Sequence, residues 1–211
     1  MKIKEFEFNP IQENTFVVYD ETKECVIIDP GCFYPDEKVE LLEFILNNDL
    51  IVKHLLNTHL HFDHVFGNAF IEERLGVLTK ANKKDEFLLD DMAAKMRMFG
   101  FHQEIEKLRV GAYIQENDTI RFGNQELIVL EVPGHSPGSV VFYSKAGYLF
   151  AGDVLFRGSI GRTDLDGGNF DQLISGIQTK LFSLPADTIV FPGHGPSTTI
   201  GFEQKNNPYL S

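Results

Sequence analysis

The placement of histidine restricts this chain more than any other feature. Three of its seven histidines fall within six positions, at His59, His61 and His64, and Asp63 lies among them. In an extended strand end, side chains two positions apart point the same way, so His59 and His61 can converge on one ion. Asp63 and His64, where the chain turns toward a helix, can face a second ion beside the first. The segment therefore predicts a metal site.

Three further polar side chains each follow a predicted strand. They are His135 in a Pro-Gly-His-Ser-Pro-Gly stretch, Asp153 after Ala-Gly, and His194 in a Pro-Gly-His-Gly stretch. Side chains that leave several strand ends can be gathered into one site by a rigid scaffold. Taken singly, each is more typical of a turn than of a metal ligand. Together with the His-x-His-x-Asp-His segment they predict one metal centre, whereas His54 and His102 are expected to be structural or surface residues.

Hydrophobic patterning predicts strands with interspersed helices, then a run of strands, then a last helix and strand. Strands are expected at 2–8, 15–19, 25–28, 51–56, 119–122, 126–132, 140–144, 148–151 and 188–191. Helices are expected from Pro35 and over 65–75, 85–99 and 171–182. The inward side of the first helix is expected to comprise Val39, Leu42, Ile45 and Leu46. The strands from 119 to 151 predict an antiparallel meander, and two face-to-face sheets with helices outside accommodate the whole order.

Composition excludes several classes of protein. The chain has 211 residues, 43% of them hydrophobic, which fits a single globular domain over 1–211. Its 31 acidic residues exceed 19 Lys and Arg, giving a net charge of −12 that argues against a nucleic-acid partner. No apolar run is long enough to span a bilayer, and the charged start is unlike a signal peptide. We expect a cytoplasmic protein without membrane contact, in which Cys25 and Cys32 are free thiols.

On these residues, the sequence resembles the metallo-β-lactamase superfamily from about residue 14 to the C-terminus. The segment 58–64 is specific when the later His, Asp and His follow in this order and spacing. The resemblance implies an α/β protein with a four-layer αββα sandwich, the metallo-β-lactamase fold. It further implies that one metal is held by His59, His61 and His135, the other by Asp63, His64 and His194, and that Asp153 bridges them.

The residue at Asp153 and the segment after it narrow the implied activity. The β-lactamases carry Cys or Ser where this chain has Asp153, so the resemblance argues against antibiotic hydrolysis. The run 156–164 and the Asn-Pro-Tyr at 207–209 resemble the small glyoxalase II-like hydrolases. These imply a binuclear hydrolase of small acyl thioesters, such as S-lactoylglutathione. An iron-dependent persulfide dioxygenase, which shares a similar Gly-Arg-Thr-Asp, and a non-catalytic metal-binding module are the alternatives.

A binuclear centre suits thioester chemistry. Two dications about 3.5–4 Å apart lower the pKa of a bridging water toward ~7 and stabilise the oxyanion and the leaving group. Asp63 is the expected catalytic residue, because as a ligand it also orients that water. Imidazoles and carboxylates without a thiolate suit Zn²⁺, with Fe²⁺ or Mn²⁺ as alternatives. The ions leave a small positive charge at the site, so a small anionic thioester is the expected substrate.

The thiol half of the substrate is expected to be held weakly. Glyoxalase II enzymes add a helical C-terminal domain, whereas 17 residues follow His194 in this sequence. Those enzymes contact the thiol half through one basic and two aromatic residues. At the corresponding positions, the resemblance gives this chain a basic residue, Arg162, but Asp164 and Pro196 in place of the aromatic residues. Arg162 can bind a substrate carboxylate or pair with Asp164.

Two other features each have two interpretations. Asp29, in an Asp-Pro-Gly turn, is either a support beneath the metals or a plain turn aspartate. The Met-rich helix 85–99 and the segment 100–111 either belong to the core or form a lid over the pocket.

Overall fold

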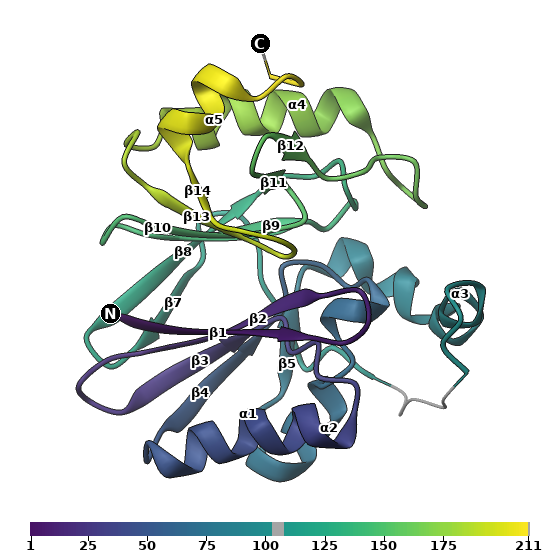
Figure 1. Ribbon diagram of the computed structural model, residues 1–211, viewed down its shortest axis with the longest axis vertical. Helices are drawn as coiled ribbons and strands as arrows, with labels where there is room; N and C mark the ends of the chain where they lie inside the picture. The colour runs from purple at the N-terminus through teal and green to yellow at the C-terminus, as the bar shows by residue number, and fades with distance from the viewer. Residues whose placement is uncertain (103–107, 211) are drawn as a thin grey trace.

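Two six-stranded sheets face each other, with helices on both outer sides (Figure 1). This computed structural model describes residues 1–102 and 108–210. The first sheet contains, in spatial order, β1 (Lys2–Phe8), β2 (Glu13–Tyr19), β3 (Glu24–Ile28), β4 (Ile51–Leu56), β5 (Thr79–Ala81) and β6 (Ala112–Tyr113). The second contains β14 (Thr198–Thr199), β13 (Ile189–Pro192), β10 (Tyr148–Gly152), β9 (Val140–Ser144), β8 (Gln125–Glu131) and β7 (Thr119–Phe122). The strands β11 (Leu155–Phe156) and β12 (Ser159–Ile160) pair with each other.

The helices complete a four-layer αββα sandwich. Helices α1 (Pro35–Asn47) and α2 (Asn68–Leu75) lie along the outer face of the first sheet, and α4 (Phe170–Thr179) and α5 (Ile200–Asn206) lie over the second (Figure 1). Helix α3 (Met92–Met98) lies at one side, where the 3₁₀ turns η1 (Phe62–His64) and η2 (Lys83–Leu89) also occur. A third turn, η3 (Leu181–Ser183), follows α4. This is the architecture that the sequence predicts.

Alternation along the central strands explains the layers. Successive strand side chains point to opposite faces of a sheet. Val18 and Val26 therefore pack between the two sheets, whereas Val17 and Ile27 pack on the other face, against Leu41 of α1. Because both faces of these strands are buried, their sequences read as continuous apolar runs.

The antiparallel meander β7–β8–β9–β10 has the predicted pairing. The inward face predicted for α1 was partly wrong. Val39 and Leu46 are 50% and 61% exposed, whereas Leu41 and Ile45 are fully or almost fully buried. The helix is rotated so that these two residues, one turn apart, pack in the core, and Val39 and Leu46 lie on the exposed side.

The two predicted helices beside the histidine segment are shorter than expected. The first begins at Asn68, because η1 and the residues after it form a turn in which the Gly67 N–H donates to the Pro30 carbonyl at 2.7 Å. The second is divided into η2 and α3, and Asp85 of η2 is buried against loops of the second sheet. The predicted last helix, 171–182, is α4 followed by η3. Strands β5, β6, β11, β12 and β14 and helix α5 were not predicted, since two to seven residues carry little periodicity.

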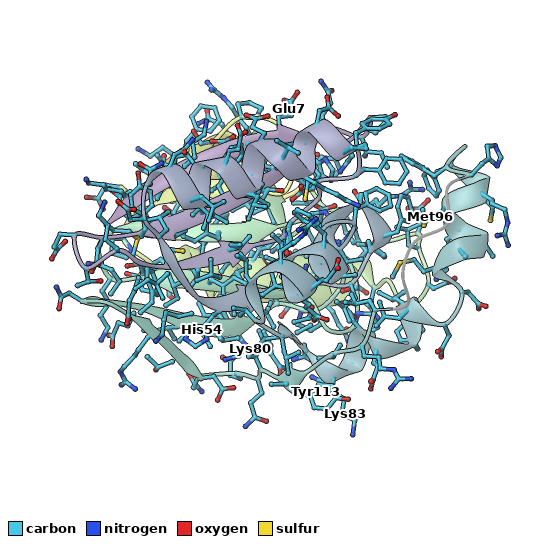
Figure 2. The ribbon with its side chains drawn as sticks, turned by 90° about the horizontal axis from the view of Figure 1, so that it is seen from below. Glu7, His54, Lys80, Lys83, Met96 and Tyr113 are labelled. Atoms are coloured by element: carbon cyan, nitrogen blue, oxygen red, sulfur yellow. The ribbon has the colours of Figure 1, made fainter. Side chains whose placement is uncertain are left out.

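Figure 2 shows the first sheet from its helical side, with His54 and Lys80 labelled. His54 contacts the Arg121 carbonyl at 3.0 Å and the Lys80 amine at 2.8 Å, which agrees with the structural role expected for it. Cys25 and Cys32 are buried free thiols, as predicted. In the part of the chain that the structure describes, no helix has both the length and the apolar character needed to cross a membrane.

A buried carboxylate joins two turns at the far end of β2. Asp20 accepts hydrogen bonds from the Thr22 N–H at 2.9 Å, the Asn124 N–H at 2.7 Å and the Gln125 amide at 3.2 Å. Burial opposes ionisation, but these bonds and the Thr22 hydroxyl lower the pKa of Asp20 from 3.8 to about 2. Asp20 therefore stabilises the fold above its unfolded pKa, and this contribution is lost as the pH falls toward 2.

We expect Asp20→Asn to lower the free energy of unfolding by about 1–2 kcal/mol at pH 7, because buried donors lose a charged acceptor. The difference from wild type should shrink as the pH falls from about 4 to 2. Urea unfolding followed by circular dichroism across this range measures it. A constant difference at all pH values would contradict the role given to the ionised carboxylate.

Candidate metal centre

The seven predicted ligands leave the strand ends at one edge of the sandwich. Each follows a strand or lies in the turn after one: His59, His61, Asp63 and His64 after β4, His135 after β8, Asp153 after β10, and His194 after β13. Strands β3 and β4 are parallel, as are β10 and β13, so their carboxyl ends lie at the same edge. The structure brings all seven side chains together there.

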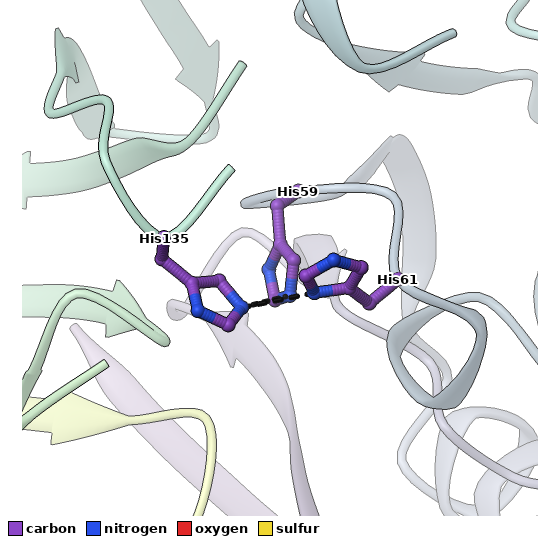
Figure 3. A group of neighbouring side chains, drawn as sticks. All are labelled: His59, His61 and His135. Carbon is purple, nitrogen blue, oxygen red and sulfur yellow. Dashed lines mark hydrogen bonds between the residues drawn. The ribbon is translucent and has the colours of Figure 1, made fainter. Parts of the chain in front are cut away.

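His59, His61 and His135 form the first donor group (Figure 3). The His135 Nε2 lies 3.2 Å from His59 Nε2 and 2.9 Å from His61 Nδ1. The other nitrogen of His135 contacts the Arg162 carbonyl at 2.8 Å, so it carries the ring proton and leaves a lone pair on Nε2. Lone pairs that face one another at this distance repel unless a cation lies between them. The group therefore fits a metal ion.

Asp63, His64 and His194 form the second donor group. The Asp63 Oδ2 lies 3.2 Å from His194 Nε2 and 3.7 Å from His64 Nε2. The His194 Nδ1 contacts the carbonyls of Ile11 and Gln12 at 3.2 and 3.1 Å, which leaves the lone pair of Nε2 to bind a metal. Two imidazoles and a carboxylate again match the ligands that divalent transition metals prefer.

Asp153 lies between the two groups. Its Oδ2 is 3.5 Å from His135 Nε2, and its Oδ1 is 3.4 Å from His64 Nε2 and 3.7 Å from His194 Nε2. The buried Asp153 Oδ1 and His64 Nε2 have no hydrogen-bond partner. Buried polar atoms are normally satisfied, so orphaned atoms at the centre of a donor cluster are consistent with ion binding. One carboxylate oxygen facing each group is the arrangement of a bridging ligand.

The charges of the centre attract cations. Burial opposes ionisation of Asp153, but His64 lowers its pKa well below the usual value. Burial likewise disfavours the charged form of His64, yet Asp153 and Asp63 raise its pKa well above the usual value. His61 is different, because burial and the neighbouring His135 lower its pKa to about 3. The protein alone therefore places a proton among these carboxylates, where a metal ion can replace it.

A buried network supports His64 from behind. Asp29 lies 3.2 Å from His64 Nδ1 and also accepts hydrogen bonds from the Thr58 N–H and hydroxyl at 2.7 and 2.6 Å. Of the two interpretations of Asp29, this geometry favours support of the centre. Glu13, which the sequence analysis missed, is fully buried 3.8 Å from His64 Nδ1. Burial raises the pKa of Glu13 well above its usual value.

The loop that carries His194 is fixed across the two sheets. The Asn14 side chain in β2 donates to the carbonyls of Pro192 and Gly195 at 3.1 and 2.8 Å, and its N–H donates to the Gly193 carbonyl at 2.7 Å. A Cβ at Gly193 would collide with Asp153 and His64, so only glycine allows this approach. Asn14 was not predicted, since a polar residue in a strand gives no sequence signal of a contact with residues so distant in sequence.

A cleft of about 620 Å³ opens over the centre. Its floor includes His61, Asp63, His135, Asp153 and His194, and its apolar walls include Ile11, Phe62, Met98, Phe99 and Leu165. Each of the two interpretations of the Met-rich segment holds for part of helix α3. Met92 and Met96 are buried in the core, whereas Met98 is 84% exposed and lines the cleft with Phe99. Of the predicted lid segment 100–111, residues 103–107 lie outside the described residues.

Among the described residues, the two basic side chains that line the cleft are paired with acids. Arg162 binds Asp164 through two hydrogen bonds of 2.7 and 2.8 Å, the ion pair that was the alternative to substrate binding. Lys95 of α3, which the sequence analysis did not single out, lies 2.9 Å from Asp166, a residue that also lines the cleft. Exposed ion pairs are weak, so an anionic ligand can compete for either cation.

Comparisons with known proteins agree with this site and fold. A family model described as the metallo-beta-lactamase superfamily matches residues 8–194. Hydroxyacylglutathione hydrolase GloC of Haemophilus influenzae is 37% identical over all of this chain and 99% of its own length. The probable metallo-hydrolase YqgX of Bacillus subtilis is 36% identical over all of this chain and 98% of its own.

Among solved structures, the B3 metallo-beta-lactamase BLEG-1 has a TM-score of 0.89 at 37% identity and full coverage of both chains. The protein TTHA1623, solved in a di-iron-bound form, has a TM-score of 0.86 at 38% identity and covers 98% of this chain and all of its own.

We expect Asp153→Ala to reduce the content of both metals, because its carboxylate oxygens face both donor groups. His194→Ala should mainly empty the second group. Elemental analysis of purified variants against protein concentration gives the stoichiometry, with His54→Ala as a histidine control away from the cleft. Two full equivalents in Asp153→Ala would overturn the bridging assignment.

Proposed function

The chain belongs to the metallo-beta-lactamase superfamily, and from this premise we propose that it hydrolyses small acyl thioesters of the S-lactoylglutathione type. It is a metal-dependent hydrolase of that superfamily. The thioester specificity rests chiefly on one observation: two donor groups share Asp153 beneath a cleft whose cations, Lys95 and Arg162, can meet an anionic substrate. The full-length similarity to a hydroxyacylglutathione hydrolase supports the same substrate class.

We assign the two metals to the two donor groups, with Asp153 between them. Two divalent ions held there would supply a water of lowered pKa and a Lewis acid that polarises the thioester carbonyl. Zn²⁺ is the expected ion, and Fe²⁺ and Mn²⁺ suit the same donors. The di-iron form of a related protein favours testing iron directly.

The side chains of the chain perform the other steps. Asp63 lies on the cleft floor and its Oδ2 faces both His64 and His194, so it can accept a hydrogen bond from a water held there and aim that water at the carbonyl carbon. Phe62, Phe99 and Met98 form the apolar wall that excludes bulk water from the acyl group. A thiolate leaves without full protonation, so no dedicated acid is required beside it.

An iron-dependent persulfide dioxygenase is the second candidate. It would need one metal at His59, His61, His135 and Asp153. The iron in a related structure matches the metal of this candidate, whereas its two ions match the two donor groups of the first. Oxygen separates the two activities, because hydrolysis consumes none.

We expect the metal-loaded protein to hydrolyse S-lactoylglutathione and other short acyl thioesters at the same rate with and without oxygen. Free thiol released from each thioester is measured, together with metal content of the same preparation and oxygen uptake with glutathione persulfide. Asp63→Asn should lose activity by at least about a hundredfold, and His54→Gln should retain it. Oxygen uptake as the sole activity would favour the second candidate, and hydrolysis of a chromogenic cephalosporin alone would assign a lactamase instead.

We expect Arg162→Ala and Lys95→Ala each to raise the KM for S-lactoylglutathione about fivefold with little change in kcat, because an exposed ion pair contributes equally to the ground and transition states. Asp166→Asn should lower KM, since it removes the carboxylate that competes for Lys95. Steady-state kinetics on this thioester and on an uncharged thioester measure both effects.

Lys84→Ala is the matched control for Lys95. Lys84 also forms an ion pair, at 2.7 Å from Glu131, but it is not among the residues that line the cleft. An unchanged KM in both cleft variants would show that other residues bind the anionic end of the substrate.

A further inference from the structure

A buried carboxylate lies between the two chain segments that provide the first donor group, His59, His61 and His135. Asp85 in η2 is fully buried, belongs to neither donor group and does not line the cleft. Its Oδ2 accepts from the Ser136 hydroxyl at 2.6 Å and the Leu60 N–H at 3.3 Å, and its Oδ1 accepts from the Gly138 N–H at 2.6 Å. Burial raises the pKa of this carboxyl group, and the three hydrogen bonds oppose that rise.

The donors to Asp85 belong to both ligand-bearing segments. Leu60 lies between His59 and His61 in the segment after β4, and Ser136 directly follows His135 in the loop between β8 and β9. These segments come from different sheets, and the Asp85 carboxylate joins them beside the hydrogen bond of 2.8 Å from the Val140 N–H to the Thr58 carbonyl. Asp85 reaches the histidines only through neighbouring residues, because its hydrogen bonds are to Leu60, Ser136 and Gly138.

The His135 loop is built to receive this carboxylate. An added Cβ at Gly138 would lie 2.7 Å from the Asp85 Cγ, too close for any other residue without a shift. The Ser139 hydroxyl contacts the Ser136 hydroxyl at 2.8 Å and accepts from the Ser136 N–H at 3.1 Å. The loop after His135 is therefore fixed by a closed set of hydrogen bonds with Asp85 at its centre.

A carboxylate has a property here that an amide lacks. Both of its oxygens accept hydrogen bonds, and the three donors use both. An asparagine at this position presents one acceptor oxygen, so its NH₂ group must face either the Gly138 N–H or the Ser136 and Leu60 donors. One ligand-bearing segment must then move away or leave a buried donor unsatisfied.

We propose that Asp85 is a positioning residue for the first metal, because it holds His59 and His61 at the right separation from His135. Metal–imidazole bonds of about 2.0–2.1 Å tolerate little error in the position of the rings. A displacement of about 0.5 Å in one segment is enough to weaken such a site. In the second donor group, His64 is contacted by Asp29 and Glu13 and the His194 loop is held by Asn14, so its affinity should depend little on Asp85. This inference rests on the metal assignment made above, and is independent of the thioester specificity.

The test measures zinc binding by the metal-free protein in competition with a chromophoric chelator. Wild type should bind two zinc ions. Asp85→Asn should weaken one of the two affinities about tenfold, the size reported for groups that support ligands, and leave the other within about twofold. Asp20→Asn is the matched control, because it removes a buried carboxylate that joins two turns at the far end of β2, away from the donor groups.

Three results separate the explanations. If Asp85→Asn lowers the unfolding temperature as Asp20→Asn does but keeps both zinc affinities, the residue is merely structural and the proposal is wrong. If wild type binds no zinc and no iron, the metal assignment itself fails, and this inference fails with it. A selective loss of one affinity in Asp85→Asn, with unchanged binding in Asp20→Asn, supports it.

Ser136→Ala covers the case in which Asp85→Asn does not fold. This variant removes one donor to Asp85 and leaves the carboxylate in place. We expect a smaller loss, about threefold, in the same zinc affinity. An unchanged affinity in Ser136→Ala would also count against the proposal.

Discussion

Five imidazoles and two carboxylates, all buried or half-buried, meet beneath the cleft, and the rest of the site depends on this concentration of metal-binding groups. The Nε2 atoms of His59 and His135 face each other at 3.2 Å, and the carboxylates of Asp63 and Asp153 both face His64 Nε2. Such a cluster is unfavourable unless positive charge enters it. The protein must therefore fix these side chains by other contacts, so that they stay together before a metal binds.

The two sheets provide that rigidity because they contribute different ligands. The segment after β4 comes from the first sheet, and those after β8, β10 and β13 come from the second. Asn14 of β2 binds the His194 loop of the second sheet. Asp85 joins the segment after β4 in the first sheet to the His135 loop of the second. A close-packed core between the sheets then limits their relative movement. Positions of the ligands thus follow from sheet packing as much as from local sequence.

The layers of the fold and the cluster of ligands could be predicted from the sequence for physical reasons. Buried strands give long apolar runs, and ligands at strand ends share a short motif of His, Asp, Gly and Pro. Short elements such as β5 and β14 give no period to detect. Glu13, Asp85 and Lys95 were missed because an isolated acidic or basic residue has no local sign of burial or of a distant partner.

The segment from Asp85 to Phe99 connects the metal centre with the cleft wall. Its first residue is tied to both ligand-bearing segments, its middle is fixed by the buried Met92 and Met96, and its end exposes Met98 and Phe99 to the cleft. A substrate that packs against Phe99 or displaces Asp166 from Lys95 therefore touches an element whose other end carries Asp85, the residue bonded to the loop that follows His135.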